Sequence, residues 1–218
     1  MENQWDIRGE AGLEFFGKMS ASLSHDMKNV LATVNENAGL IQDYAGLVQD
    51  GKPLDAERVN AIAGKIREQV QRADNIVKNL NRLAHSVDEF SAHIDVSEMM
   101  TFLISLCRRI ASSRGIGIEL HPAPVPVTIS TNPFFFKNLL WLCLDFAMTV
   151  ADENRNIGVF VEDKEKGAVI RLAGLGNLAN TPEIPFPGKK EKALLDALGA
   201  DSETDPESGE LIITLYGV

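Results

Sequence analysis

The chain of 218 residues is poor in cysteine, has no apolar run long enough to cross a membrane and carries no excess of positive charge. Its two cysteines, Cys107 and Cys143, stand in apolar segments at a spacing that matches no metal motif, so we expect both in the core. The most apolar stretch, residues 134–150, is interrupted by charged and amide side chains, which excludes a membrane span. A formal net charge of -10 argues against binding nucleic acid or an anionic membrane through bulk electrostatics.

The N-terminal residues are acidic and polar and lack the apolar core of a signal peptide, so we expect a cytoplasmic protein. Hydrophobic residues make up 44% of the chain and charged residues 24%, which is typical of a globular protein that buries a core. The length suffices for one large domain or two modest ones.

Two long helical patterns occupy the N-terminal part of the chain. The first runs from about Ala11 to Gln49 and ends at a turn signal, Asp50–Pro53. The second begins near Asp55, and its apolar residues recur at alternate steps of four and three, which predicts a supercoiled helix. A single hairpin cannot cover both faces of such rods, so we expect two hairpins to pair as a homodimeric four-helix bundle. The apolar positions of the second pattern are Val59, Ala63, Ile66, Val70, Ala73, Val77, Leu80, Ala84 and Val87.

After Ile94 the pattern becomes mixed, with helical segments separated by short alternating ones. We expect helices and mostly antiparallel strands to segregate into a two-layer α/β sandwich, so that the chain belongs to the α+β class. The predicted domains are a helical hairpin, residues 1–93, and the sandwich, residues 94–218. The predicted helices are Ser97–Ser113, a segment from Asn132-Pro133 to Val150, and Gly188–Leu198; the predicted strands are Gly117–His121, Val125–Ser130, Ile157–Glu162, Ala168–Leu172 and Glu210–Tyr216.

The first helix contains the hexapeptide Ser24–Asn29, in which His25 falls between two apolar positions and should point to solvent. An imidazole in water is mostly neutral near pH 7, and Asp26 could accept the proton of one ring nitrogen and leave the other free to attack phosphorus. Asn29 follows one turn later on the same side of the helix. A lone exposed histidine on a helix is more often only a solvated residue, so the rest of the chain decides between the two interpretations.

The hexapeptide and its place on a long hairpin resemble the H-box of bacterial two-component histidine kinases. The cores of these proteins join a dimerising helical hairpin to an ATP-binding α/β sandwich. The resemblance implies that His25 carries the phosphoryl group, that Asp26 assists its transfer as an acid or base, and that Asn29 positions a water molecule or a carbonyl group. The sequence departs from the family at Val30, where many members have a proline and a helix kink.

The second domain resembles the kinase ATP-binding domain in the order of its elements, but residues that would hold the nucleotide are replaced. Leu142 and Phe146 stand where the family presents asparagines, and Leu172 replaces the aspartate that reads adenine. A glycine turn, Gly174–Gly176, remains, and the loop Asn177–Pro187 is short for an ATP lid. Apolar side chains cannot compensate the charge of Mg-ATP, so we expect a relic of an ATP site and no cofactor.

This combination resembles the histidine phosphotransferases of bacterial phosphorelays, which keep the histidine hairpin beside a degenerate kinase-like domain. The resemblance implies that His25 exchanges phosphoryl groups with aspartates of response-regulator receiver domains, with magnesium supplied by the receiver. Docking of the partner is assigned to Ser22, Lys28 and Thr33 on the side of His25, although ordinary solvated side chains would give the same pattern.

Two other hypotheses remain open from the sequence. A non-catalytic regulator would bind a kinase or a response regulator through the hairpin, and its binding would survive substitution of His25. An atypical sensor histidine kinase would need affinity for nucleotide, which the three apolar replacements predict to be undetectable.

Overall fold

A computed structural model describes residues 4–165, 167–180 and 185–216. The chain forms two compact units, and each is described here by itself. One unit combines the chain up to Met19 with Leu83 and all that follows, and the other consists of Ser20–Arg82. The first helix therefore contributes to both units. The predicted domain division at residues 93 and 94 stays a prediction.

The unit Ser20–Arg82 is a helical hairpin built from the greater parts of α1 (Gln4–Gln49) and α2 (Ala56–Ala84). The turn between the helices contains Gly51 at a φ of 83°, a backbone conformation that glycine adopts without steric cost. Beside the turn, the Arg58 guanidinium donates a hydrogen bond of 3.2 Å to the Tyr44 hydroxyl. The first helix begins at Gln4 rather than near Ala11 and continues without interruption through Val30.

The apolar side chains of the hairpin unit divide into a buried set and an exposed set. Val30 on α1 is buried, and so are Ile62 and Ile76 on α2. The two α2 residues lie outside the predicted heptad pattern of that helix. Within that pattern Val70 remains 57% exposed, and Val77 is exposed as well. The hairpin thus leaves apolar surface uncovered, as the length of its helices predicted.

The other unit is built around a five-stranded sheet with strand order β2-β4-β5-β7-β6. Strands β2 and β4 are parallel, and all the other pairs of this sheet are antiparallel. Strands β1 and β3 form a separate antiparallel pair. The strands are β1 (Ala92–Asp95), β2 (Gly117–His121), β3 (Thr128–Thr131), β4 (Asn156–Lys164), β5 (Gly167–Ala173), β6 (Ala200–Asp205) and β7 (Glu210–Tyr216).

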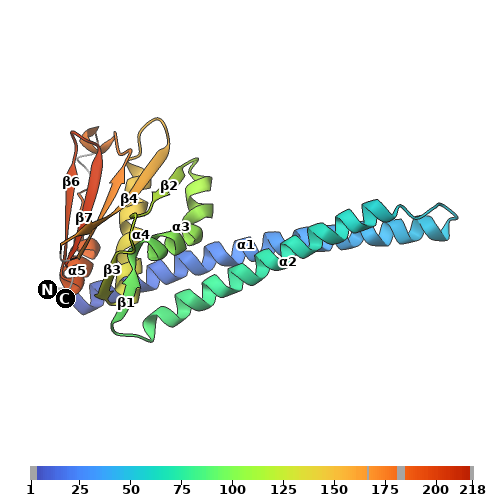
Figure 1. Ribbon diagram of the computed structural model, residues 1–218, viewed down its shortest axis with the longest axis horizontal. Coiled ribbons are helices and arrows are strands. Elements are labelled where there is room, and N and C mark those ends of the chain that lie inside the picture. Colours follow the sequence, from blue (N-terminus) through green and yellow to red (C-terminus); the bar gives the residue numbers. More distant parts are fainter. Residues whose placement is uncertain (1–3, 166, 181–184, 217–218) are drawn as a thin grey trace. The chain divides into compact units, whose positions relative to one another are not determined.

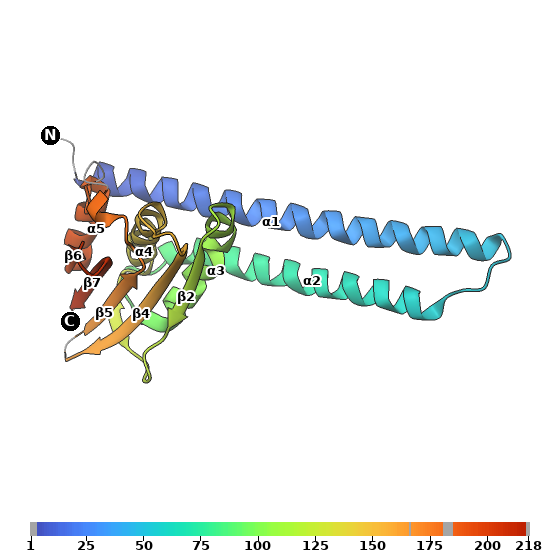
Figure 2. The same cartoon turned by 90° about the horizontal axis from the view of Figure 1, so that it is seen from above.

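Three helices, α3 (Val96–Ser113), α4 (Pro133–Thr149) and α5 (Lys189–Leu198), lie along one face of this sheet (Figures 1 and 2). Local signals set two of their starts, because Asp95 and Asn132 each accept a hydrogen bond of 2.8 Å from a backbone N–H in the first turn. The core between helices and sheet is built from alternate strand residues and from most of α4. Its fully buried members include Phe136, Leu139, Leu144, Ile157, Val159, Ile170, Leu211 and Ile213.

The N-terminal turns of α1 cover the outer side of α4 and α5. Phe15 is buried and meets Phe134 edge to face at a centroid distance of 5.9 Å. Lys18 pairs with Asp145 at 3.8 Å, and the Lys190 ammonium lies 2.9 Å from Glu14. These contacts between distant parts of the sequence explain why the start of α1 belongs to the unit that contains the sheet.

The predicted α+β class, with helices first and a sheet-containing region after them, is confirmed. Strands β1 and β6 were not predicted from the sequence. Two further elements, η1 (His85–Val87) and η2 (Leu178–Asn180), are single turns of 3-10 helix. Across the residues that the structure describes, no helix is both long enough and apolar enough to cross a membrane.

Candidate functional site

His25 lies on the exposed surface of α1, as its place between two apolar positions predicted. Among the described residues, one side chain forms a hydrogen bond with its ring. The amide nitrogen of Asn29 lies 3.2 Å from His25 Nδ1, one helical turn away. Residues four apart on a helix face the same side, so this contact follows from the local spacing alone. It occupies Nδ1, and among the described residues no hydrogen bond reaches Nε2.

Two arrangements of protons satisfy this contact. In the first, the Asn29 amide donates to Nδ1, and the ring proton resides on Nε2. In the second, the amide is turned by 180° so that its oxygen accepts the Nδ1 proton, and the lone pair of Nε2 is free. The second arrangement is the one in which Nε2 can act as a nucleophile, since the ring proton is then held on the opposite nitrogen.

Asp26 is half-buried, and within the described residues it forms no hydrogen bond or ion pair with His25. The contact with the ring nitrogen that the sequence suggested for Asp26 is therefore made by Asn29 in this structure. A role of Asp26 as an acid or base stays a prediction.

The three residues predicted to dock a partner have different environments. Lys28 is exposed, and Thr33 is half-buried with its hydroxyl donating a 3.0 Å hydrogen bond to the backbone carbonyl of Asn29. Ser22 is only 4% exposed, so its predicted place on the exposed side of the helix is wrong. The reason is helical spacing, because Ser22 follows Met19 by three residues and Phe15 by seven and shares their buried side.

In the segments where the sequence resemblance places an ATP site, the structure shows packed apolar side chains. Phe146 on α4 stacks on Phe186, which precedes α5, with ring centroids 4.4 Å apart and an angle of 23° between the planes. Leu142 is half-buried one turn before Phe146, and Leu172 is fully buried in β5. Residues 181–184 of the short loop lie outside the described part of the chain. Phe186 was missed from the sequence, where its only signal is an aromatic residue between two prolines.

The glycine turn at residues 174–176 has a structural explanation. Gly174 has a φ of 89°, and a Cβ atom there would collide with the backbone carbonyl of Asn156. Its carbonyl accepts a 2.9 Å hydrogen bond from Asp152 N–H, and Leu175 N–H donates a 3.0 Å bond to the Gly209 carbonyl. These bonds join the turn to its neighbouring segments. Close packing alone therefore explains the glycine, and no bound nucleotide is needed to account for it.

Other candidate groups of the sequence take structural positions. Cys107 and Cys143 are buried, and burial raises the pKa of both thiols well above the usual range, which keeps them protonated. The His85 ring lies 2.7 Å from Asp88, and His93 contacts the Ser130 hydroxyl at 2.8 Å. In the described ranges, no three His, Cys, Asp or Glu side chains gather in a way that could hold a metal ion.

No family model and no curated protein match the chain. Solved structures do match it, at low sequence identity. The ATP-binding domain of PrrB from Mycobacterium tuberculosis is 16% identical, with a TM-score of 0.47, over 60% of this chain and 99% of that one. The histidine kinase AdeS of Acinetobacter baumannii is 13% identical, with a TM-score of 0.46, over 83% and 94% of the two chains.

A third solved structure is described as a bacterial phosphotransferase. It is 12% identical, with a TM-score of 0.47, over 93% of this chain and 95% of its own. Two of these three neighbours are histidine kinase structures, the family that the sequence motifs resemble. At such identities the similarity is one of fold.

Proposed function

We propose that this protein is a histidine phosphotransferase that relays phosphoryl groups between His25 and receiver-domain aspartates and does not phosphorylate itself from ATP. The observation that carries the proposal is the site at His25. Its ring is exposed on a helix, Asn29 contacts Nδ1 at 3.2 Å, and Nε2 faces away from that contact. A positioned imidazole is sufficient for transfer from an acyl phosphate, since proximity and orientation supply most of what the reaction needs.

The transfer step requires little more from this chain. The Nε2 lone pair forms the new P–N bond while the P–O bond to the receiver aspartate breaks, and the aspartate leaves as a carboxylate. In the arrangement with the Asn29 amide turned, the Nδ1 proton stays in its hydrogen bond to the Asn29 amide oxygen during the step. Magnesium held by the receiver domain neutralises charge on the phosphoryl oxygens, so no metal site is needed on the hairpin.

The stack of Phe146 on Phe186 supports the absence of ATP-dependent kinase activity in this proposal. The two rings lie 4.4 Å apart in the region where the resemblance would place the nucleotide. Together with Leu142 and the buried Leu172, they are apolar side chains at positions where Mg-ATP needs charged or hydrogen-bonding groups. A cytoplasmic location, where response regulators are available, belongs to the same proposal.

A homodimer formed through the hairpin is also part of the proposal. Several large apolar side chains of the hairpin unit are exposed, and a second copy would bury them in a four-helix bundle. Light scattering should show a dimer, Val77→Glu should dissociate it, and Asn75→Glu on an exposed position of the same helix should not. The exposed apolar side chains are Leu31, Leu40, Leu47, Val48, Val70, Val77 and Leu80.

The test of the proposal is phosphoryl transfer from phosphorylated receiver domains of the same organism, measured as acid-labile phosphate on this protein. Wild type should become labelled, and His25→Ala should remain unlabelled. His85→Ala is the matched control, because His85 is also exposed and also contacts a neighbouring side chain, Asp88 at 2.7 Å. That variant should label like wild type.

Three results would overturn the proposal in different ways. Equal label on wild type and His25→Ala would place the phosphate elsewhere. Absence of label with every receiver, combined with retained receiver binding, would establish the non-catalytic regulator. Label obtained from Mg-ATP alone would establish an atypical kinase.

A further inference from the structure

An open apolar pocket of about 390 Å³ lies in the unit that contains the sheet. One wall is the first turns of α1, and the other consists of Val87 and the start of α4. The volume falls within the range of small-molecule sites, about 300–1,000 Å³. The lining residues are Trp5, Arg8, Gly9, Gly12, Leu13, Phe16, Val87, Phe134 and Phe135.

Several apolar side chains that line this pocket are largely exposed to solvent. Leu13 is 75% exposed and Trp5 is 65% exposed, although both stand on a helix whose other side is buried. Single exposed apolar residues are ordinary, but a cluster that lines a hollow marks a binding surface. The helix also carries Gly9 here, and a Cβ atom at this position would have no neighbour within 4 Å. A glycine inside a helix is unfavourable, and Gly9 lines the pocket without a side chain that would fill it.

One charged side chain belongs to the pocket. The Arg8 guanidinium carbon lies 4.5 Å from the centre of the Trp5 ring and 5.8 Å from that of Phe135. Its Nε donates to the Gln4 carbonyl at 3.3 Å. Among the residues that the structure describes, no carboxylate forms an ion pair with Arg8. An uncompensated cation on an apolar wall favours an anion that can place its charge there and its apolar part in the hollow.

We propose that this pocket binds a small aromatic anion, in which a carboxylate or sulfonate meets Arg8 and the ring system lies among Trp5, Phe134 and Phe135. The aromatic walls favour a planar ring system, because aromatic pairs gain from offset stacking and edge contacts beyond the burial of area. This site is independent of the proposed phosphotransfer at His25.

The test compares two fluorescent probes that share one ring framework. Anilinonaphthalene sulfonate carries the anion, and N-phenylnaphthylamine lacks it. Titration of the full chain should give saturable binding of the sulfonate at one site and weaker binding of the neutral probe. Arg8→Gln should weaken sulfonate binding about threefold to fivefold, the effect of one partly exposed charge contact, and leave the neutral probe unchanged.

Two glycine substitutions on the same helix separate the pocket from general apolar surface. Gly9→Leu should fill the hollow and abolish binding of both probes. Gly17→Leu is the matched control, because a Cβ atom at Gly17 also meets nothing within 4 Å and Gly17 does not line the pocket. Both changes raise helix propensity, so neither should reduce folding, and circular dichroism checks this.

The proposal is overturned if Gly9→Leu binds the sulfonate like wild type, since the probe then binds elsewhere. It is also overturned if Arg8→Gln weakens both probes equally, because the ligand then needs no anion. Binding that appears only after the protein is diluted to a monomer would show that a second copy occupies the pocket. That outcome would reject the small-molecule assignment and leave the phosphotransfer test unaffected.

Discussion

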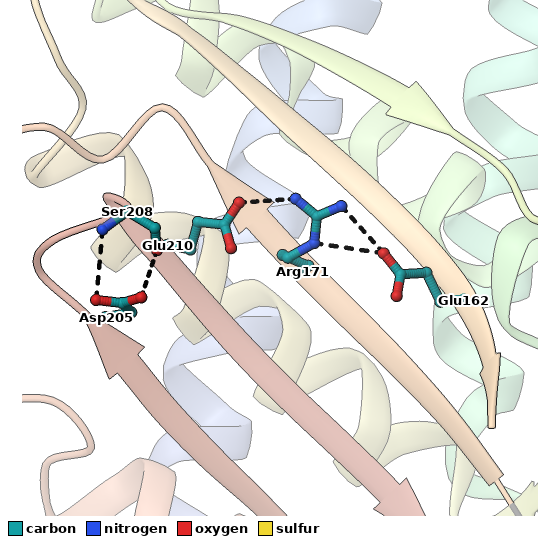
Figure 3. Close-up of polar contacts among 5 residues, drawn as sticks. All are labelled: Glu162, Arg171, Asp205, Ser208 and Glu210. Carbon is teal, nitrogen blue, oxygen red and sulfur yellow. Dashed lines mark hydrogen bonds and ion pairs between the residues drawn. The ribbon is translucent and has the colours of Figure 1, made fainter.

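Arg171 on β5 links three strands on the face of the sheet that lies away from the helices, and replacing it should destabilise the sheet (Figure 3). Its guanidinium donates to Glu210 on β7 at 2.7 Å and to Glu162 on β4 at 3.0 Å. It also lies 4.4 Å from the centre of the Phe160 ring. Both carboxylates raise the pKa of Arg171 through their hydrogen bonds, so it stays charged wherever the protein folds.

Arg171→Met keeps the apolar stem over Phe160 but removes the charge. The Arg171 side chain is 28% exposed, so each ion pair should contribute about 0.5–1 kcal/mol, at the upper end for surface pairs. The cation–π contact adds about 0.5–1 kcal/mol. After allowance for the packing that methionine retains, the free energy of unfolding should fall by about 2 kcal/mol. Arg171→Lys keeps the charge but not the two-sided fork, and should lose about half as much.

Urea unfolding followed by circular dichroism measures these differences, and a double-mutant cycle assigns them. Glu210→Gln combined with Arg171→Met should be less harmful than the sum of the two single changes, by at least about 0.5 kcal/mol. An Arg171→Met protein as stable as wild type, or strict additivity in the cycle, would refute the assignment of stability to these ion pairs.

Three further predictions concern the candidate site and the docked start of α1. Asn29→Ala should slow labelling of His25 about twofold, because an exposed contact between residues one turn apart contributes about 0.2–0.5 kcal/mol. A rapid phosphotransfer assay measures the labelling rate, and an unchanged rate would show that Asn29 does not position the ring. The Lys190 hydrogen bond lowers the pKa of Glu14, so Glu14→Gln should destabilise the protein by about 0.5 kcal/mol at neutral pH. This stability difference between wild type and Glu14→Gln should vanish as the pH falls through the lowered pKa. Thermal unfolding at several pH values measures it, and a difference that persists at low pH would contradict the prediction. Calorimetric titration with Mg-ATP should show no binding to wild type, and measurable affinity would reject the apolar filling of the site by Phe146.

The parts of the fold that the sequence predicted are those that depend on local spacing. The helices Ser97–Ser113 and Gly188–Leu198 were placed within one residue of α3 and α5, because their apolar periods and end signals lie inside each segment. Strand β2 matched its prediction at both ends for the same reason. Strand β6, with the sequence Ala200–Asp205, has little apolar pattern and exists through its pairing with β7, so no local signal marks it.

The sequence by itself determined the long helices, the exposed place of His25 and the position of Asn29 one turn from it, since a helix converts spacing directly into proximity. Tertiary structure alone decided that Phe186 stacks on Phe146. It also decided that the first turns of α1 pack on α4 and form one wall of an apolar pocket. The physical reason is that burial and long-range pairing depend on which distant segments meet, and periodicity along one helix carries no record of its partner.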